Sequence, residues 1–341
     1  MTKRNTILFS ALAVATLLLF VVDLAVGSVA IPLDEVWRGL WGSGAEGDAT
    51  SLIIRNFRLP KAVMALLAGA ALSTVGLQMQ TLFRNPLAGP YVLGVSSGAS
   101  LGVSIMLLGL PLLGISTANP VVQNVGVAGA AWIGSAAIMM VVMAVTARIK
   151  NIMTVLILGM MFGSAASALV EIMQYLSPEG ALKSYVVWTM GSLGGVTLSQ
   201  LCVVVPVIVV GLVLSVLLIK PLNILLLGEN YARTMGLNIR RTRLMVTLTT
   251  VLLAGTVTAY CGPIGFVGLA VPHVARMLFR EADHRVLVPA TMLCGTTIML
   301  LCDIASSLPA SDLSLPINTV SALVGIPIVI IVIFRNRKMM M

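Results

Sequence analysis

The stretch KPLNILLLGENYARTMGLNIRRTR, residues 220–243, is a polar segment between two long apolar runs. It holds five Lys or Arg residues and one acid, Glu229. The flanking runs, roughly Leu198–Ile219 and Leu244–Tyr260, are each close to the ~20 residues that a helix needs to cross a ~30 Å hydrocarbon core. A segment this charged lies in water, so the pattern indicates two membrane-spanning helices joined by an aqueous loop.

The composition extends this interpretation to the whole chain. Of the 341 residues, 58% are hydrophobic and only 10% are charged, whereas soluble domains carry about 25% charged residues. The apolar runs are continuous rather than alternating, which favours helices over a closed β-barrel. The sequence therefore predicts an all-α polytopic membrane protein. A net charge of +9 is then assigned to cytoplasmic loops and not to a nucleic-acid partner.

Apolar segments of this kind recur, and we predict about ten transmembrane helices in a single domain covering residues 1–341. The first run is too long for a signal peptide and is expected to be retained as a span. The stretch Leu182–Leu193 predicts a further helix that does not span. The ten segments are roughly Ile7–Ala30, Lys61–Leu82, Val92–Leu110, Val125–Val145, Met153–Tyr175, Leu198–Ile219, Leu244–Tyr260, Phe266–Phe279, Val286–Ile304 and Ile317–Phe334.

Basic residues predict the orientation, because cytoplasmic loops carry an excess of Lys and Arg. With ten crossings and both termini in the cytoplasm, segment 220–243 is cytoplasmic. The longest outer loop is expected to run from Pro32 to Pro60. Of the 21 basic residues, the ones that fall outside the cytoplasmic set are Arg38, Arg55, Arg58, Lys61 and Lys183.

Two small-residue patterns bear on packing. Leu-Ala-Gly occurs at 67–69 and 253–255, and Gly-Pro follows each copy, at 89–90 and 262–263. The spans concerned would run in opposite directions, so we expect a weak inverted internal repeat. Gly94, Gly98 and Gly102 recur at four-residue spacing, which favours close helix packing, with a mobile gating seam as the alternative.

Ionisable residues inside the spans are few. Asp23, Glu171 and Asp303 all lie near predicted span ends, where we expect water to reach them. A proton relay needs several such groups at mid-depth, and their scarcity argues against an ion-coupled transporter. His273 and His284 do not share one helical face, so structural roles are favoured for both.

The sequence offers no constellation for catalysis or metal binding. The four cysteines lack metal-ligand spacing and are interpreted as small hydrophobic residues. No GxxxxGK[ST] phosphate loop and no Ser/His/Asp set occurs. We therefore expect a non-enzymatic chain without a metal site, a catalytic residue or a cofactor of its own.

Several motifs together resemble one known family. They are RLPK (58–61), RNPLAGPYVLGVSSGA (84–99), LGENYARTMG (227–236), GPIGFVGLAVPH (262–273), DHR (283–285) and LPI (315–317). The chain is similar, from about residue 55 to 334, to FecCD-type permeases of bacterial ABC importers for iron-siderophores, haem and vitamin B12. Each motif alone is weak evidence for this family, but the six motifs together are specific for it.

The resemblance implies a homodimeric, multi-pass permease of the bacterial inner membrane. Its partners would be two cytoplasmic ABC ATPase subunits, which bind ATP and Mg²⁺, and an extracytoplasmic substrate-binding protein. It implies import of a metal chelate, an iron-siderophore or haem, by alternating access along the dimer axis. Cobalamin import is the close alternative. The more remote alternative is an ion-coupled secondary transporter that acts alone.

The resemblance also implies roles for three sets of residues. The segment that docks on the ATPase is matched by Gly228, Glu229, Ala232 and Gly236, with Arg240 and Arg241 beside it. The docking rim for the binding protein is matched by Arg58 and Lys61, to which Arg55 is added. The inner end of the pathway is matched by Asn85, Leu87, Asn151, Ile152 and Met153.

Four positions depart from the family pattern. Ser306 and Ser307 stand where relatives often carry a basic residue, Ser314 replaces a common acid, and Asn318 replaces a usual glycine. The outer docking surface is therefore expected to rely more on Arg55 and on the pair Arg58 and Lys61. Rim charges of this kind mainly steer and register a partner.

Overall fold

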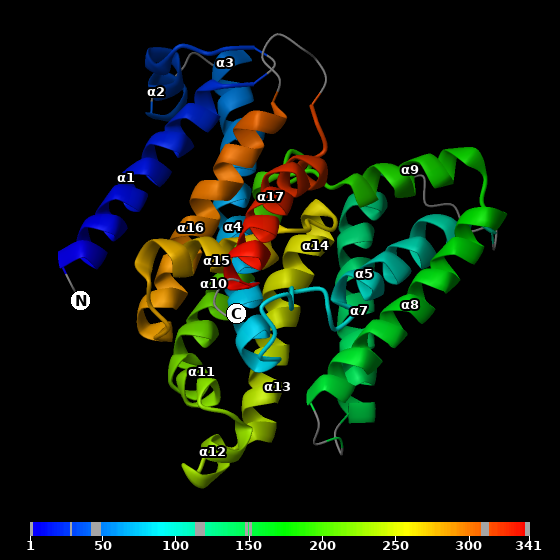
Figure 1. The fold of residues 1–341 in the computed structure, drawn as a ribbon. Coiled ribbons are helices and arrows are strands. Elements are labelled where there is room, and N and C mark those ends of the chain that lie inside the picture. Colours follow the sequence, from blue (N-terminus) through cyan, green and yellow to red (C-terminus); the bar gives the residue numbers. More distant parts are fainter. Residues whose placement is uncertain are drawn as a thin grey trace. The chain divides into compact units, whose positions relative to one another are not determined.

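The computed structural model describes residues 3–27, 29–41, 49–112, 120–146, 149, 152–307 and 314–337. These residues are helical nearly throughout, which confirms the all-α prediction (Figure 1). They form two compact units, each built from segments distant in sequence. Unit 1 comprises residues 1–74, 192–209 and 264–341, and unit 2 comprises residues 75–191 and 210–263.

Eight helical segments among the described residues are long and apolar enough to cross a membrane. Two shorter apolar helices, Val267–Phe279 and Ile317–Ile331, accompany them. All ten lie at the positions predicted for the ten apolar segments. The eight longer segments are Lys3–Ala25, Ala49–Leu82, Val95–Leu112, Gly126–Val145, Met153–Leu176, Leu198–Leu217, Ile239–Cys261 and His284–Ser306.

Unit 1 packs its helices around α16. Helix α1 lies along α16, and α15 contacts both α16 and α17. A carbon at Cβ of Gly69, on α4, would lie 2.3 Å from the carbonyl oxygen of Gly295 on α16, so the two backbones touch. The helices of this unit are α1 (Lys3–Ala25), α2 (Leu33–Trp41), α3 (Ala49–Ile53), the π-helix η1 (Ile54–Arg58), α15 (Val267–Phe279), α16 (His284–Ser306) and α17 (Ile317–Arg337).

Unit 2 is organised around α5, which packs on α7 and α8. Helices α4 (Leu59–Leu82) and α10 (Leu198–Leu217) each contribute to both units. The other helices of this unit are α5 (Val95–Ser104), η2 (Ile105–Gly109), α6 (Leu110–Leu112), α7 (Pro120–Thr146), α8 (Ile152–Leu176), α9 (Glu179–Met190), α11 (Ile219–Leu226), α12 (Glu229–Thr234), α13 (Ile239–Thr250), η3 (Val251–Gly255) and α14 (Thr256–Cys261).

The glycine ridge of α5 is a packing seam against α7. A Cβ on Gly98 would lie 2.5 Å from the carbonyl oxygen of Gly134, and one on Gly102 would lie 2.0 Å from that of Ala130. Small residues allow two helices to approach this closely where lipid gives no hydrophobic drive for association. Gly94 acts differently: it caps the start of α5 with a φ of 81°, in the left-handed region that favours glycine.

This seam leads to a first prediction. Gly102→Ala is expected to lower the unfolding temperature of the purified protein, because the added methyl group would overlap the Ala130 carbonyl. Overpacking of this kind typically costs about 1–3 kcal/mol. Gly129→Ala is the matched control on α7, since a Cβ there meets nothing within 4 Å. Thermal unfolding in detergent measures both variants, and equal midpoints would contradict the seam.

The described part of the outer loop predicted between Pro32 and Pro60 is helical. Residues 33–41 form α2, and a helical segment starts at Ala49 and continues to Leu82. Pro60 lies inside this segment, directly after η1. Proline lacks a backbone N–H and would break the interior of a regular α-helix, and here the chain is π-helical over Ile54–Arg58, just before Pro60. Proline was therefore an unreliable boundary signal here.

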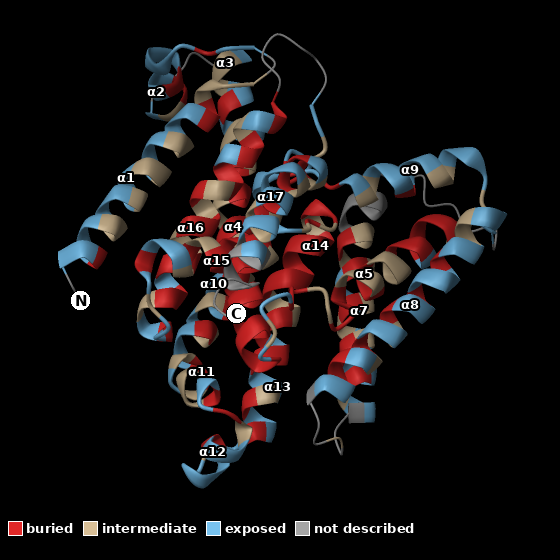
Figure 2. Ribbon diagram, viewed as in Figure 1, coloured by how far each residue is buried: buried red, intermediate tan, exposed pale blue. Residues whose placement is uncertain are grey.

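Burial differs sharply between helices (Figure 2). Within the most apolar 18-residue window of segment Ala49–Leu82, 83% of the residues are buried, against 11% for α1. α1 therefore presents most of its apolar surface outward, as a helix at the lipid boundary does. The non-spanning helix predicted at Leu182–Leu193 is present as α9, three residues earlier in the chain.

Candidate functional site

The polar segment 220–243 folds as two short helices, α11 and α12, that lead into α13. Its two glycines adopt backbone conformations that favour glycine over other residues. Gly228, which precedes α12, has a φ of 102°, and Gly236, which follows it, has a φ of 80°. Gly236 N–H donates to Arg233 O, and Leu237 N–H donates to Ala232 O. This is the Schellman arrangement, in which a left-handed glycine ends a helix.

Ala232 and Glu229, two further positions of LGENYARTMG, also have physical roles. Ala232 is fully buried on the inner side of α12, where a larger side chain would separate the helix from its support. Glu229 occupies the first turn of α12, where a carboxylate interacts favourably with the helix dipole. The spacing Gly-Glu-x-x-Ala-x-x-x-Gly therefore specifies one six-residue helix with defined ends.

An ion pair ties α12 to α13. Arg243 Nη2, on α13, donates to Glu229 Oε1 over 2.6 Å. Both side chains are about one-fifth exposed. Arg243 also donates to the backbone oxygen of Ile149 over 3.2 Å, and Arg233 Nη2 lies 3.8 Å from Glu229 Oε2. The acid predicted to act in coupling is thus held within the chain, where it fixes α12.

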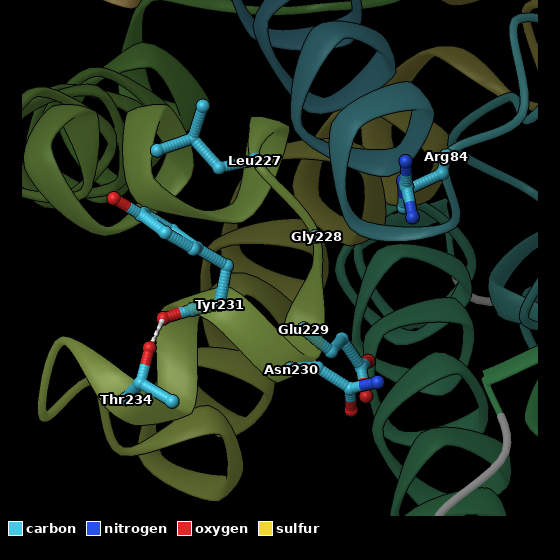
Figure 3. Close-up of a pocket in the computed structure, with 7 residues that line it drawn as sticks. All are labelled: Arg84, Leu227, Gly228, Glu229, Asn230, Tyr231 and Thr234. Atoms are coloured by element: carbon cyan, nitrogen blue, oxygen red, sulfur yellow. Dashed lines mark hydrogen bonds between the residues drawn. The ribbon is translucent and has the colours of Figure 1, made fainter.

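The outer surface of this segment exposes both apolar and polar side chains. Leu227, Tyr231 and Met235 are each more than half exposed. A cavity of about 620 Å³ lies beside α12 (Figure 3), and its lining is Arg84, Leu227, Gly228, Glu229, Asn230, Tyr231 and Thr234. In Figure 3 the side chains of Glu229 and Asn230 point to one side of the segment, and that of Tyr231 points to the other.

The two arginines predicted beside this segment lie in the first turn of α13. Asn238 caps this helix, because its side-chain oxygen accepts a hydrogen bond of 3.0 Å from Arg241 N–H. Arg240 and Arg241 are both exposed. They are positioned to meet a partner, whereas Arg243, one turn further on, is turned toward Glu229.

The arginines of the predicted docking rim make contacts within unit 1. Arg58 donates to the carbonyl oxygens of Leu24 and Ala25 over 2.8 and 2.7 Å, and also to that of Val29. Since α1 ends at Ala25, Arg58 caps that helix, as cations favour helix C-termini. Arg55 caps α2 in the same way, with a hydrogen bond of 2.7 Å to Gly39 O.

Lys61, the third rim cation, is largely buried. Its Nζ lies 3.0 Å from Asp303 Oδ1 and 2.7 Å from Ser307 Oγ. Asp303 is only 1% exposed and Asp23 only 6%, so the expectation that water reaches these two acids is wrong. Asp23 lies close enough to Lys61 and Asp303 to interact electrostatically with both. Lys61, Asp23 and Asp303, the buried ionic cluster, join α1, α4 and α16.

The predicted pathway residues fall on two segments of unit 2. Asn85 and Leu87 share the turn after α4, where Asn85 Oδ1 accepts a hydrogen bond of 2.9 Å from Leu87 N–H. Ile152 begins α8, and Met153, in its first turn, is about half exposed. Asn151 lies outside the described residues. The role of these residues in a gate stays a prediction.

The sequence did not reveal the roles of three side chains in these sites. Arg243 was predicted only as one of the basic residues of segment 220–243, because nothing in its spacing distinguishes an inward from an outward arginine. Arg84 lies in a turn with a φ of 49° and reaches the cavity beside α12. Asp303 was recognised only as an acid near a span end. Its pairing with Lys61 depends on tertiary structure.

Comparisons with known proteins agree with this architecture. The chain is 34% identical to the haemin transport permease HmuU of Yersinia pestis, over 94% of this chain and 95% of that protein. It is 36% identical to the vitamin B12 import permease BtuC of Klebsiella pneumoniae, over 94% and 92%. An ABC transporter permease of Bacillus subtilis, YvrB, is 34% identical over 97% and 93%.

A solved structure and a family model complete the comparison. A metal-chelate type ABC transporter in an inward-facing conformation superposes with a TM-score of 0.81 and 28% identity, over 97% of this chain and 99% of that one. The model of the FecCD transport family matches residues 15–335. The described spans, the matched family and the permease relatives agree, and the chain belongs to the FecCD transport family as a multi-pass ABC transporter permease.

Proposed function

We propose that this chain is the membrane subunit of an ATP-driven importer that moves a metal chelate, an iron-siderophore or haem, along the axis of a homodimer. Two ABC ATPase subunits would bind ATP and Mg²⁺ at the cytoplasmic side. A substrate-binding protein would deliver the ligand on the opposite side. Both termini then lie in the cytoplasm. Transport proceeds by alternating access, in which ATP binding changes which end of the pathway is open.

The geometry of α12 is the observation that carries this proposal. The helix has defined ends, is anchored to α13 by Glu229 and Arg243, and exposes Tyr231 and Met235. A soluble ATPase can grip such a surface, and the anchor passes the displacement to α13. A loosely attached loop would absorb that displacement. α12 is therefore our proposed coupling helix.

The class of ligand is supported by two similarities. HmuU is named for haemin, and the superposed structure is of a metal-chelate type. The runner-up ligand, cobalamin, is supported by the BtuC relatives of similar identity. We assign specificity to the binding protein, because the candidate pathway residues offer few groups that could recognise the chemical structure of a ligand.

A reconstituted complex tests this proposal. The permease, its ATPase and its binding protein are combined, and ATP hydrolysis is measured with the binding protein loaded in turn with a ferric siderophore, haem or cobalamin. We expect stimulation by a siderophore or by haem. Stimulation by cobalamin alone would overturn the ligand assignment and leave the importer assignment standing. Substrate uptake by the permease without any ATPase subunit would overturn both.

A further inference from the structure

Helix α2 (Leu33–Trp41) has three distinct stripes. Val36, Gly39 and Leu40 face the interior of unit 1. Asp34, Glu35 and Arg38 form a charged stripe, and Arg38 pairs with Asp34 at 3.8 Å in solvent. The third stripe is exposed and apolar, and its members lie one turn apart on one face. They are Leu33, Trp37 and Trp41, exposed by 59%, 67% and 75%.

The orientation of α2 is fixed by its inner stripe. A Cβ on Gly39 would lie 2.6 Å from Cδ1 of Ile54, so the helix backbone rests directly on η1. Val36 and Ile54 belong to one buried apolar cluster, and Arg55 holds the end of the helix through Gly39 O. Rotation that would bury both tryptophans would break these contacts. Their exposure is therefore built into the packing.

The helices next to α2 indicate which environment this apolar stripe faces. α2 contacts α1 and η1. It begins eight residues after α1 ends, from Ala25 to Leu33. α1 is a candidate span and has only 11% of its most apolar window buried within the chain, as expected for a helix that faces lipid. Phe57, on η1, is also 65% exposed. The stripe thus continues a lipid-facing surface at the level where α1 leaves the bilayer.

We propose that α2 is an interfacial anchor that lies in the lipid headgroup region with Leu33, Trp37 and Trp41 against the acyl chains. Tryptophan is enriched at this depth because its ring is apolar and its N–H is polar. A short amphipathic helix with an aromatic face lies in the interface plane. The three charged residues of α2 sum to −1, so attachment depends on apolar burial and not on anionic lipid.

The test uses tryptophan fluorescence, because the chain has four tryptophans. In the variant Trp132→Phe/Trp188→Phe, emission reports Trp37 and Trp41 alone. The protein is reconstituted in phosphatidylcholine bilayers brominated either near the carboxyl end or near the methyl end of the acyl chain. We expect quenching at least about twofold stronger with the shallow bromines, as an interfacial depth requires. Replacing a fifth of the lipid with phosphatidylglycerol should leave this ratio unchanged.

Two results would overturn the anchor. One is emission insensitive to both brominated lipids and quenched by aqueous iodide, which would place the tryptophans in water. The other is emission that changes only when the substrate-binding protein is added, which would assign the stripe to protein docking. The reciprocal variant Trp37→Phe/Trp41→Phe reports Trp132 and Trp188. It confirms that both brominated bilayers quench the spans, because Trp132 lies in α7 and is 40% exposed.

Discussion

Replacing Glu229 with Arg is expected to lower ATP-driven uptake by at least about tenfold while the permease still folds. The substitution removes the 2.6 Å ion pair with Arg243 and places three guanidinium groups together, counting Arg233. Hydrogen bonds to charged groups are worth about 1.5–3 kcal/mol, and 1.4 kcal/mol is tenfold in an equilibrium. Uptake into proteoliposomes measures the loss, and detergent gel filtration checks assembly.

A rescue and a control make this prediction specific. Adding Arg243→Glu restores an ion pair of reversed polarity, so the double variant Glu229→Arg/Arg243→Glu should recover a substantial part of the uptake. Lys220→Gln removes an exposed cation from the same segment and should have little effect, since exposed charges contribute about 0–1 kcal/mol. Full uptake in the Glu229→Arg variant would remove α12 from its proposed role.

Replacing Lys61 with Met is expected to destabilise the protein by about 3–5 kcal/mol, the usual effect of removing one partner from a buried ion pair. Asp303 is almost fully buried and would lose the cation that lies 3.0 Å from its carboxylate. The double variant Lys61→Met/Asp303→Asn removes the orphaned charge and should regain most of the stability. Thermal or denaturant unfolding in detergent measures all three proteins.

Asp23→Asn is the matched control for the buried ionic cluster. Lys61 forms its ion pair with Asp303, and Asp23 is a buried acid beside that pair. The substitution removes the charge of this buried acid and leaves the Lys61–Asp303 ion pair in place, so Asp23→Asn should lose much less stability than Lys61→Met. If instead Lys61→Met unfolds normally and only weakens affinity for the binding protein, Lys61 acts as a docking cation and not as a structural one.

The ten apolar segments could be predicted because the signal is local. A helix that crosses lipid must be apolar over its whole length, and each such run is read directly from the chain. The short helices were harder to predict from the sequence. α2 has an apolar-aromatic stripe and an internal glycine, but nine residues between a proline and a Gly-Ser-Gly stretch resemble a loop. Its packing on Ile54 stabilises it, and the sequence does not reveal that contact.

The candidate site residues show the same difference: those with a local role could be predicted, and those paired across the fold could not. Gly228 and Gly236 could be placed because each marks a helix end, and backbone conformation at a glycine is a local property. The pairing of Lys61 with Asp303 joins residues 242 positions apart (303 − 61), and no periodicity connects them. Arg55, Arg58 and Lys61 were predicted as one outward-facing set. The structure shows that each also stabilises a different element of unit 1.

The most direct test of the central claim is uptake into proteoliposomes that contain the permease with its ATPase subunits and the loaded binding protein outside. We predict chelate accumulation that requires ATP and Mg²⁺ at the ATPase side and persists when proton and sodium gradients are collapsed. It should fall to background with the Glu229→Arg permease. Accumulation driven by an ion gradient in the absence of ATP would contradict the account.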